Sequence, residues 1–313
     1  MSLIASIGEL LIDLISVEEG DLKDVRLFEK HPGGAPANVA VGVSRLGVKS
    51  SLISKVGNDP FGEYLIEELS KENVDTRGIV KDEKKHTGIV FVQLKGASPS
   101  FLLYDDVAYF NMTLNDINWD IVEEAKIVNF GSVILARNPS RETVMKVIKK
   151  IKGSSLIAFD VNLRLDLWRG QEEEMIKVLE ESIKLADIVK ASEEEVLYLE
   201  NQGVEVKGSM LTAITLGPKG CRLIKNETVV DVPSYNVNPL DTTGAGDAFM
   251  AALLVGILKL KGLDLLKLGK FANLVAALST QKRGAWSTPR KDELLKYKEA
   301  REVLAEGHHH HHH

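Results

Sequence analysis

One segment places three small residues and an acid at the start of an apolar helix. Gly244, Ala245 and Gly246 lead into the apolar run 250–258, and Asp247 lies in the same turn. Small residues there let an anion approach bare backbone N–H groups, and the helix dipole favours negative charge. This helix start is a candidate site for a phosphate or oxyanion and is here called the anion seat. A carboxylate beside it could accept the proton of a substrate hydroxyl, as phosphoryl transfer requires. The alternative is a helix cap at Asp247 and a tight glycine turn.

A second segment combines paired glycines with a side-chain amide. Gly33 and Gly34 allow a ligand to approach the backbone closely, and Pro36 is a typical first residue of a helix. Asn38 offers both a donor and an acceptor, which suits a sugar hydroxyl. The alternative is a loop-to-helix turn in which Asn38 packs locally.

Two rival phosphate motifs are absent or incomplete. The sequence contains no G-x-x-x-x-G-K-[ST] motif, which excludes a P-loop enzyme. Gly244 and Gly246 imitate the start of G-x-G-x-x-G, but Phe249 occupies the third small position and the preceding residues 236–240 are a poor strand. A dinucleotide-binding fold, and with it a nicotinamide oxidoreductase, is disfavoured.

Charge and composition exclude several classes of protein. The 39 Lys and Arg residues against 45 Asp and Glu give a net charge of −6, which argues against a nucleic-acid binder. No apolar run approaches the roughly 18 residues of a membrane span, and Glu9 and Asp13 interrupt the N-terminal apolar stretch. A single cysteine, Cys221, suits a reducing compartment. We therefore expect a cytoplasmic protein without nucleic-acid or membrane partners.

The six histidines at positions 308–313 are typical of an expression tag. Only His31 and His86 lie outside it, so the sequence offers no multi-histidine metal site.

Short apolar runs alternate with helix-period segments along most of the chain. Strands are predicted at 3–7, 51–56, 126–130, 156–160, 187–190 and 212–216, and helices at 36–46, 61–71, 141–151, 172–185 and 193–201. Three more helices are predicted at 245–260, 263–281 and 291–304. This alternation predicts an α/β fold with a mainly parallel central sheet and helices on both faces.

Two stretches break the alternation, at 14–30 and 77–110. In the second, the extended runs 87–94 and 100–104 flank a Gly/Ser/Pro turn at 95–99, which predicts a hairpin. We expect a small β flap over the ligand edge of the sheet, where it would exclude water; the alternative is a plain surface hairpin. Residues 1–306 are expected to form one α/β domain including this flap.

Both motifs resemble signatures of a known family. Residues 33–40, followed by Gly47 and Gly57, resemble the first signature of the PfkB (ribokinase-like) carbohydrate kinases, and residues 241–247 resemble the second. The two stand in the family's order and separation, and the resemblance runs from Ile4 to about Pro289.

The resemblance implies an ATP-dependent sugar kinase with a ribokinase-like fold. It implies that Asp247 is the catalytic base and that Gly244, Ala245 and Gly246 form the anion hole. It also gives the flap the role of a lid and, in many members, of a homodimer contact.

Within the family, further segments look most like fructokinase: residues 8–13, 57–62, 160–164 with Trp168, and 190–195. By this resemblance Asp13, Gly33, Gly34 and Asn38 bind the sugar. Asp13 is expected to follow the first strand, and Asn162 and Arg164 a later one, so that all three reach one ligand edge. Arg164 could equally recognise a substrate carboxylate or the transferred phosphate, or pair with Asp166.

The sequence departs from the family's N-x-x-E motif at Ser192. Glu195 keeps the acid position and is implied to act on Mg²⁺ through water, since Mg²⁺ usually retains several waters. Ser192 followed by Glu195 is also a capping box, and both roles can coexist.

The remaining sites come from the resemblance alone. It implies that Lys190, Ser192, Thr215, Gly217, Gly220 and Asn273 bind the nucleotide. It also suggests Asp241, Thr243 and Gly284 as candidate K⁺ ligands.

The expected reaction is transfer of the γ-phosphoryl group of ATP to the primary hydroxyl of D-fructose, giving fructose 6-phosphate. The alternatives within the family are a 2-keto-3-deoxygluconate kinase and a ribose or nucleoside kinase. A different class of alternative is a catalytically silent regulator that senses a sugar.

Overall fold

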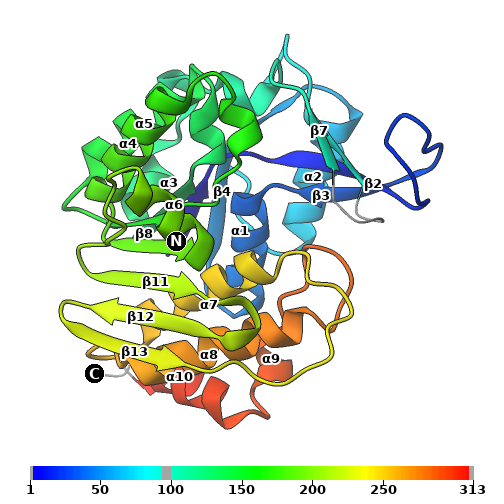
Figure 1. Ribbon diagram of the computed structural model, residues 1–313. Helices are drawn as coiled ribbons and strands as arrows, with labels where there is room; N and C mark the ends of the chain where they lie inside the picture. The colour runs from blue at the N-terminus through cyan, green and yellow to red at the C-terminus, as the bar shows by residue number, and fades with distance from the viewer. Residues whose placement is uncertain (1–2, 94–99, 310–313) are drawn as a thin grey trace.

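A nine-stranded sheet forms the centre of the computed structural model, which describes residues 3–93 and 100–309 (Figure 1). Its strand order is β13-β12-β11-β10-β9-β8-β1-β4-β5. The strands are β1 (Ile4–Ile7), β4 (Ser50–Gly57), β5 (Ile79–Asp82), β8 (Ile127–Gly131), β9 (Leu156–Asp160), β10 (Ile188–Ser192), β11 (Leu211–Thr215), β12 (Cys221–Lys225) and β13 (Thr228–Val232).

Seven neighbouring strands of this sheet run parallel to one another, in the order β11-β10-β9-β8-β1-β4-β5. Every residue of β1 and β4 is buried, as expected for central parallel strands covered on both faces. The expected mainly parallel α/β sheet is therefore confirmed. β12 and β13 add an antiparallel edge that the sequence analysis did not predict.

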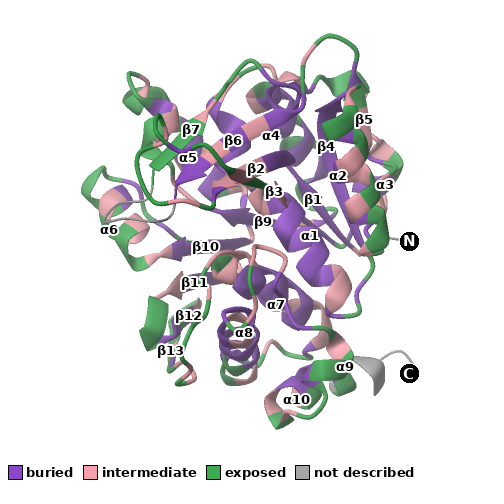
Figure 2. Ribbon diagram, turned by 90° about the vertical axis from the view of Figure 1, so that its right-hand side faces the viewer, coloured by how far each residue is buried: buried purple, intermediate pink, exposed green. Residues whose placement is uncertain are grey.

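Helices cover both faces of this sheet, as Figure 2 shows by the buried colour of its central strands. α1 (Ala35–Arg45), α7 (Ala245–Lys259), α8 (Leu265–Ser279) and α10 (Lys298–His309) share one core cluster. α3 (Trp119–Glu124), α4 (Ser140–Ile151), α5 (Glu172–Leu185) and α6 (Glu193–Asn201) contribute to the cluster on the other face. α2 (Pro60–Lys71) packs on β2 and β4.

The helix predicted at 291–304 is wrong as a single element. It is two helices, the short α9 (Lys291–Leu294) and α10. The chain turns between them, where the N–H of Tyr297 donates to the carbonyl of Leu294, three residues back. Among the described residues, no helix combines the length and the apolar character needed to cross a membrane.

A second, four-stranded sheet has the order β3-β2-β6-β7, with β2 (Leu11–Ser16), β3 (Phe28–Gly33), β6 (Gly88–Gln93) and β7 (Ser100–Leu103). Figure 1 shows it at the end of the molecule away from β12 and β13. β6 and β7 pair in antiparallel register, Val90 opposite Leu103. The turn predicted between them, 95–99, lies outside the described residues.

The boundaries expected for the flap, 14–30 and 77–110, need correction. β2 begins at Leu11, so Asp13 lies inside the small sheet and does not directly follow the first strand. Residues 79–82 are β5, at the edge of the large sheet, because they pair with β4. Residues 108–111 form a 3₁₀ turn in which Ala108, Tyr109 and Phe110 are buried in the core.

Candidate active site

The start of α7 carries the predicted anion seat. Gly244 precedes the helix with φ of +79°, a left-handed conformation that suits glycine, and a Cβ there would overlap the backbone of Ala285. Within the described residues, no side chain caps this helix start. The N–H of Ala245 donates to the carbonyl of Thr242 over 3.2 Å, so the N–H groups that follow it, together with the positive end of the helix dipole, can receive an anion.

Asp247, in the first turn of α7, is joined to the second motif by a hydrogen bond. The Nδ2 of Asn38 donates to its Oδ2 over 2.9 Å, linking residues that are 209 positions apart. Burial of the Asp247 carboxyl raises its pKa to about 6, although the nearby Lys190 ammonium acts in the opposite direction. A carboxylate with a pKa near 6 is mostly ionised at neutral pH and is well matched to accept a hydroxyl proton.

A buried ion pair lies against the same turn. Lys190 on β10 and Asp160 on β9 are register neighbours, and Nζ lies 3.2 Å from Oδ2. A Cβ added to Gly246 would lie 3.4 Å from this Nζ, so the ammonium is adjacent to the anion seat. Burial alone would lower the Lys190 pKa, but Asp160 and Asp247 outweigh it and the pKa is raised. Lys190 therefore stays protonated next to the anion seat.

The proposed sugar residues Asp13 and Gly33 meet across β2 and β3. Leu11 pairs with Gly33 and Asp13 with His31. A Cβ on Gly33 would overlap the Asp13 carboxylate, so only glycine leaves room for that side chain. Burial raises the Asp13 pKa to about 6, with His31 acting to lower it.

Gly34 connects β3 to α1, and a Cβ there would overlap the carbonyl of Glu9. This contact brings the second motif against the chain that leaves β1.

Glu9 is a further candidate site residue, to which the sequence analysis assigned no role. It is only 4% exposed, and burial raises its pKa to about 8. The charges of Asp247 and Arg164 both act on it, which places it beside the candidate site. An acid within the apolar run 7–12 was the available clue, and it also lies in the fructokinase-like segment 8–13.

The raised pKa of Glu9 predicts a pH-dependent stability. The folded chain holds this proton between the usual glutamate pKa of 4.5 and about 8, whereas the unfolded chain releases it, so the free energy of unfolding falls as pH rises through this window. Glu9→Gln should make this pH-dependent decrease in the free energy of unfolding smaller by about 2 to 4 kcal/mol. Urea unfolding at pH 5 and pH 8.5 measures it, with Glu67→Gln on the exposed side of α2 as control. Identical pH dependence in the two variants would contradict the assignment.

Arg164 follows β9 and is exposed, and its guanidinium makes no hydrogen bond or ion pair within residues 3–93 and 100–309. The alternative partner, Asp166, pairs with Arg169 instead. The guanidinium is close enough to lower the pKa of both Glu9 and Asp247.

Asn162 lies on the same loop with φ of +34°, but in the described chain no hydrogen bond joins its side chain to the other candidate residues.

Ser192 and Glu195 form the capping box at the start of α6. The Glu195 N–H donates to the Ser192 hydroxyl over 3.1 Å, and the Ser192 N–H donates to Glu195 Oε1 over 2.8 Å. The other carboxylate oxygen accepts the N–H of Leu163. Each oxygen keeps a second lone pair, so a metal-bound water still fits the role implied for Glu195.

The three candidate K⁺ residues lie together. Asp241 accepts the N–H of Thr243 over 2.8 Å and that of Gly284 over 2.9 Å. Burial raises the Asp241 pKa, but these hydrogen bonds outweigh it and the pKa lies below its usual value. In the described part of the chain, no group of three His, Cys, Asp or Glu side chains could hold a metal ion by itself. A cation here would therefore need hydroxyl, backbone or substrate oxygens as well.

The remaining nucleotide candidates lie along one edge of the fold. Thr215 ends β11, and Gly217 and Gly220 bound the turn to β12, both with positive φ. The amide of Asn273 is buried and donates to the carbonyls of Val232 and Pro233 over 3.0 and 3.1 Å.

Comparison with known proteins agrees with this geometry. The model of the pfkB family of carbohydrate kinases matches residues 1–292. The chain belongs to this family. Fructokinase-1 of Zea mays is 37% identical over 313 residues, which cover 94% of this chain and 96% of the relative.

Two solved structures of this family extend the comparison. The crystal structure of an uncharacterized sugar kinase from Pyrococcus horikoshii is 96% identical, with a TM-score of 0.92 and coverage of 97% of this chain and 100% of the other. A fructokinase from Vibrio cholerae O395, with fructose, ADP and calcium bound, is 31% identical, with a TM-score of 0.82 and coverage of 95% and 99%. The pfkB chain described here is thus an ATP-dependent sugar kinase.

Proposed function

We propose that this kinase transfers the γ-phosphoryl group of ATP to the primary hydroxyl of D-fructose, giving fructose 6-phosphate. The observation that carries the proposal is the hydrogen bond between Asn38 and Asp247, because it joins the sugar motif to the anion seat. The fructokinases among the relatives support fructose as the acceptor.

In this proposal Asp247 accepts the proton of the attacking hydroxyl. The first turn of α7 and the Lys190 ammonium stabilise negative charge on the phosphoryl group as it moves. Asp13 and Asn38 hold the sugar hydroxyls. Mg²⁺, when bound, neutralises charge on the ATP oxygens, and Glu195 would position it through water.

The small sheet acts as the lid in this proposal, because Asp13 lies within it. Its exposed apolar side chains, which include Phe101 on β7 and Tyr104 just after it, support the homodimer contact implied by the family. Asp241, Thr243 and Gly284 are proposed to hold K⁺.

Arg164 favours one second candidate, 2-keto-3-deoxygluconate. Its exposed guanidinium is not committed to any described carboxylate and acts on Asp247, so a substrate carboxylate could bind there.

A coupled assay of ADP formation with fructose, 2-keto-3-deoxygluconate, ribose and aminoimidazole riboside separates the candidates. We expect the highest kcat/KM with fructose, and an equal or higher value with any other acceptor would refute that assignment. Arg164→Met provides the matched variant: it should lower kcat/KM for a carboxylated acceptor far more than for fructose. Sugar binding without ADP formation from any acceptor would instead indicate a silent regulator.

A further inference from the structure

The side-chain amide of Asn38 is held from two sides. Its Nδ2 donates to Asp247 over 2.9 Å, and the indole Nε1 of Trp286 donates to its Oδ1 over 3.1 Å. An indole N–H can only donate a hydrogen bond. It therefore fits the amide of Asn38 in one orientation, in which the amide oxygen faces Trp286. The amide hydrogens must then point away from the indole, and one of them meets Asp247.

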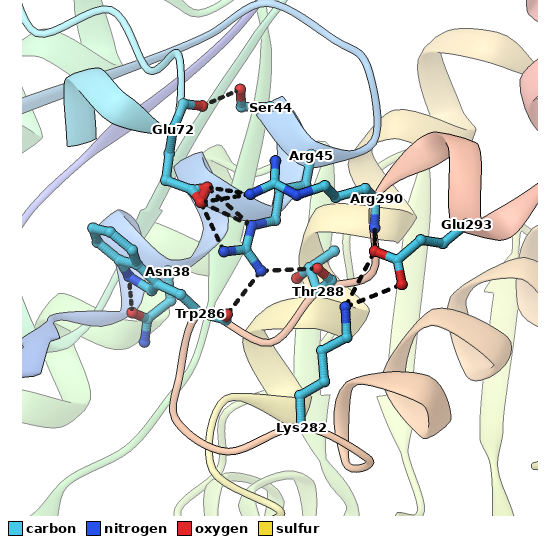
Figure 3. A network of polar contacts seen from close by, with 9 residues as sticks. All are labelled: Asn38, Ser44, Arg45, Glu72, Lys282, Trp286, Thr288, Arg290 and Glu293. Atoms are coloured by element: carbon cyan, nitrogen blue, oxygen red, sulfur yellow. Dashed lines mark hydrogen bonds and ion pairs between the residues drawn. The ribbon is translucent and has the colours of Figure 1, made fainter. Parts of the chain in front are cut away.

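A partly buried cluster of Arg45, Glu72 and Arg290, here called the clamp, fixes the segment that carries Trp286. Figure 3 shows the guanidinium of Arg45, at the end of α1, donating to the carbonyls of Trp286 and Thr288, over 2.8 and 3.1 Å. Glu72 binds the same guanidinium over 2.7 Å and also contacts Arg290. The clamp therefore ties the segment to α1, the helix that also carries Asn38.

We propose that Trp286 is a positioning residue, which holds the amide of Asn38 in the orientation that keeps Asp247 ionised and ready to accept a proton. This inference rests on the proposed function, because it assigns a supporting residue to the same base.

The physical reason is a competition between two amide orientations. A protonated Asp247 would gain from a flipped amide, since its hydroxyl could then donate to Oδ1 of Asn38. The flip would turn the NH₂ group toward the indole N–H of Trp286, placing two donors against each other. Trp286 thus disfavours the flipped, protonated pair and favours the ionised carboxylate.

Other charges around Asp247 act in both directions. Lys190 on β10 and Arg164 after β9 lower its pKa, and Asp160 on β9 raises it. Glu9, before β2, is a further carboxyl that interacts with it. A change at Trp286 leaves these four side chains in place, so its effect can be read separately.

Trp286→Phe keeps a ring in place but removes the donor. The loss of one neutral hydrogen bond predicts that the Asp247 pKa rises by about 0.5 to 1 pH unit. The carboxyl carbon of Asp247, followed by NMR in the ligand-free protein and assigned with Asp247→Asn, measures this directly. The acid limb of kcat/KM with fructose should move upward by the same amount. Trp119→Phe on α3 is the control and should change neither.

Several outcomes decide the proposal. An unchanged Asp247 pKa in folded Trp286→Phe would overturn it, whereas a raised pKa would support it even if fructose were the wrong acceptor. Absence of turnover in the wild type would count against the proposed function alone. If Trp286→Phe does not fold, the indole proton of Trp286 in the wild type gives a second measurement. It should titrate with the midpoint of Asp247, and a signal that does not move across that pH range would contradict the inference.

Discussion

Asp247→Asn should lower kcat by about 10²- to 10⁴-fold, because the amide cannot accept the proton of the attacking hydroxyl. The substitution preserves the size of the side chain and does not change the backbone N–H groups in the first turn of α7. ATP binding, measured by calorimetry, should therefore stay close to that of the wild type. The expected result is a protein that binds both substrates and turns them over at a small residual rate.

Asp264→Asn is the matched control for a change at a helix start. Asp264 caps α8 by accepting the N–H of Lys267, and asparagine caps a helix about as well as aspartate. This variant should keep full turnover. If Asp247→Asn behaved in the same way, Asp247 would be only part of a helix start and the proposed base would be lost.

Lys190→Met should give the second large effect, on both turnover and stability. Removal of the ammonium leaves the buried Asp160 without its partner, which typically costs about 3 to 5 kcal/mol of unfolding free energy. It also removes the positive charge next to Gly246, so kcat with ATP should fall by about 10²-fold or more. Urea unfolding and steady-state kinetics measure the two effects.

A double variant separates the two roles of Lys190. Lys190→Met combined with Asp160→Asn removes both charges, and uncharged replacements of a buried pair are often close to neutral in stability. We expect most of the stability to return while kcat stays low. Recovery of turnover together with stability would show that the ammonium serves the fold and not the reaction.

Features of the sequence that depend on local chemistry were predicted well. Gly244 to Asp247 stand at the start of a helix, and the capping box of Ser192 and Glu195 is present. Both follow from residue types within one turn. The parallel direction of the central strands followed from their alternation with helices, and the structure confirms it.

What the sequence did not reveal depends on contacts between distant segments. The hydrogen bond from Trp286 to Asn38 spans 248 positions, and no spacing rule indicates it. Lys190 and Asp160 meet only because β9 and β10 are neighbours in register. The β12–β13 hairpin carried a weak local clue in the sequence, since the apolar Cys221 and Leu223 alternate with Arg222. Asn226, a typical turn residue, follows them and has positive φ in the structure.

The placement of Asp13 has a consequence for how a ligand leaves. Asp13 belongs to the four-stranded sheet, whereas Asn38 and Asp247 sit on helices packed against the nine-stranded one. In the proposed mode of binding, an acceptor held by all three lies between two separately hydrogen-bonded sheets. Movement of the smaller sheet alone would then break the contact at Asp13 and leave the hydrogen bond between Asn38 and Asp247 in place.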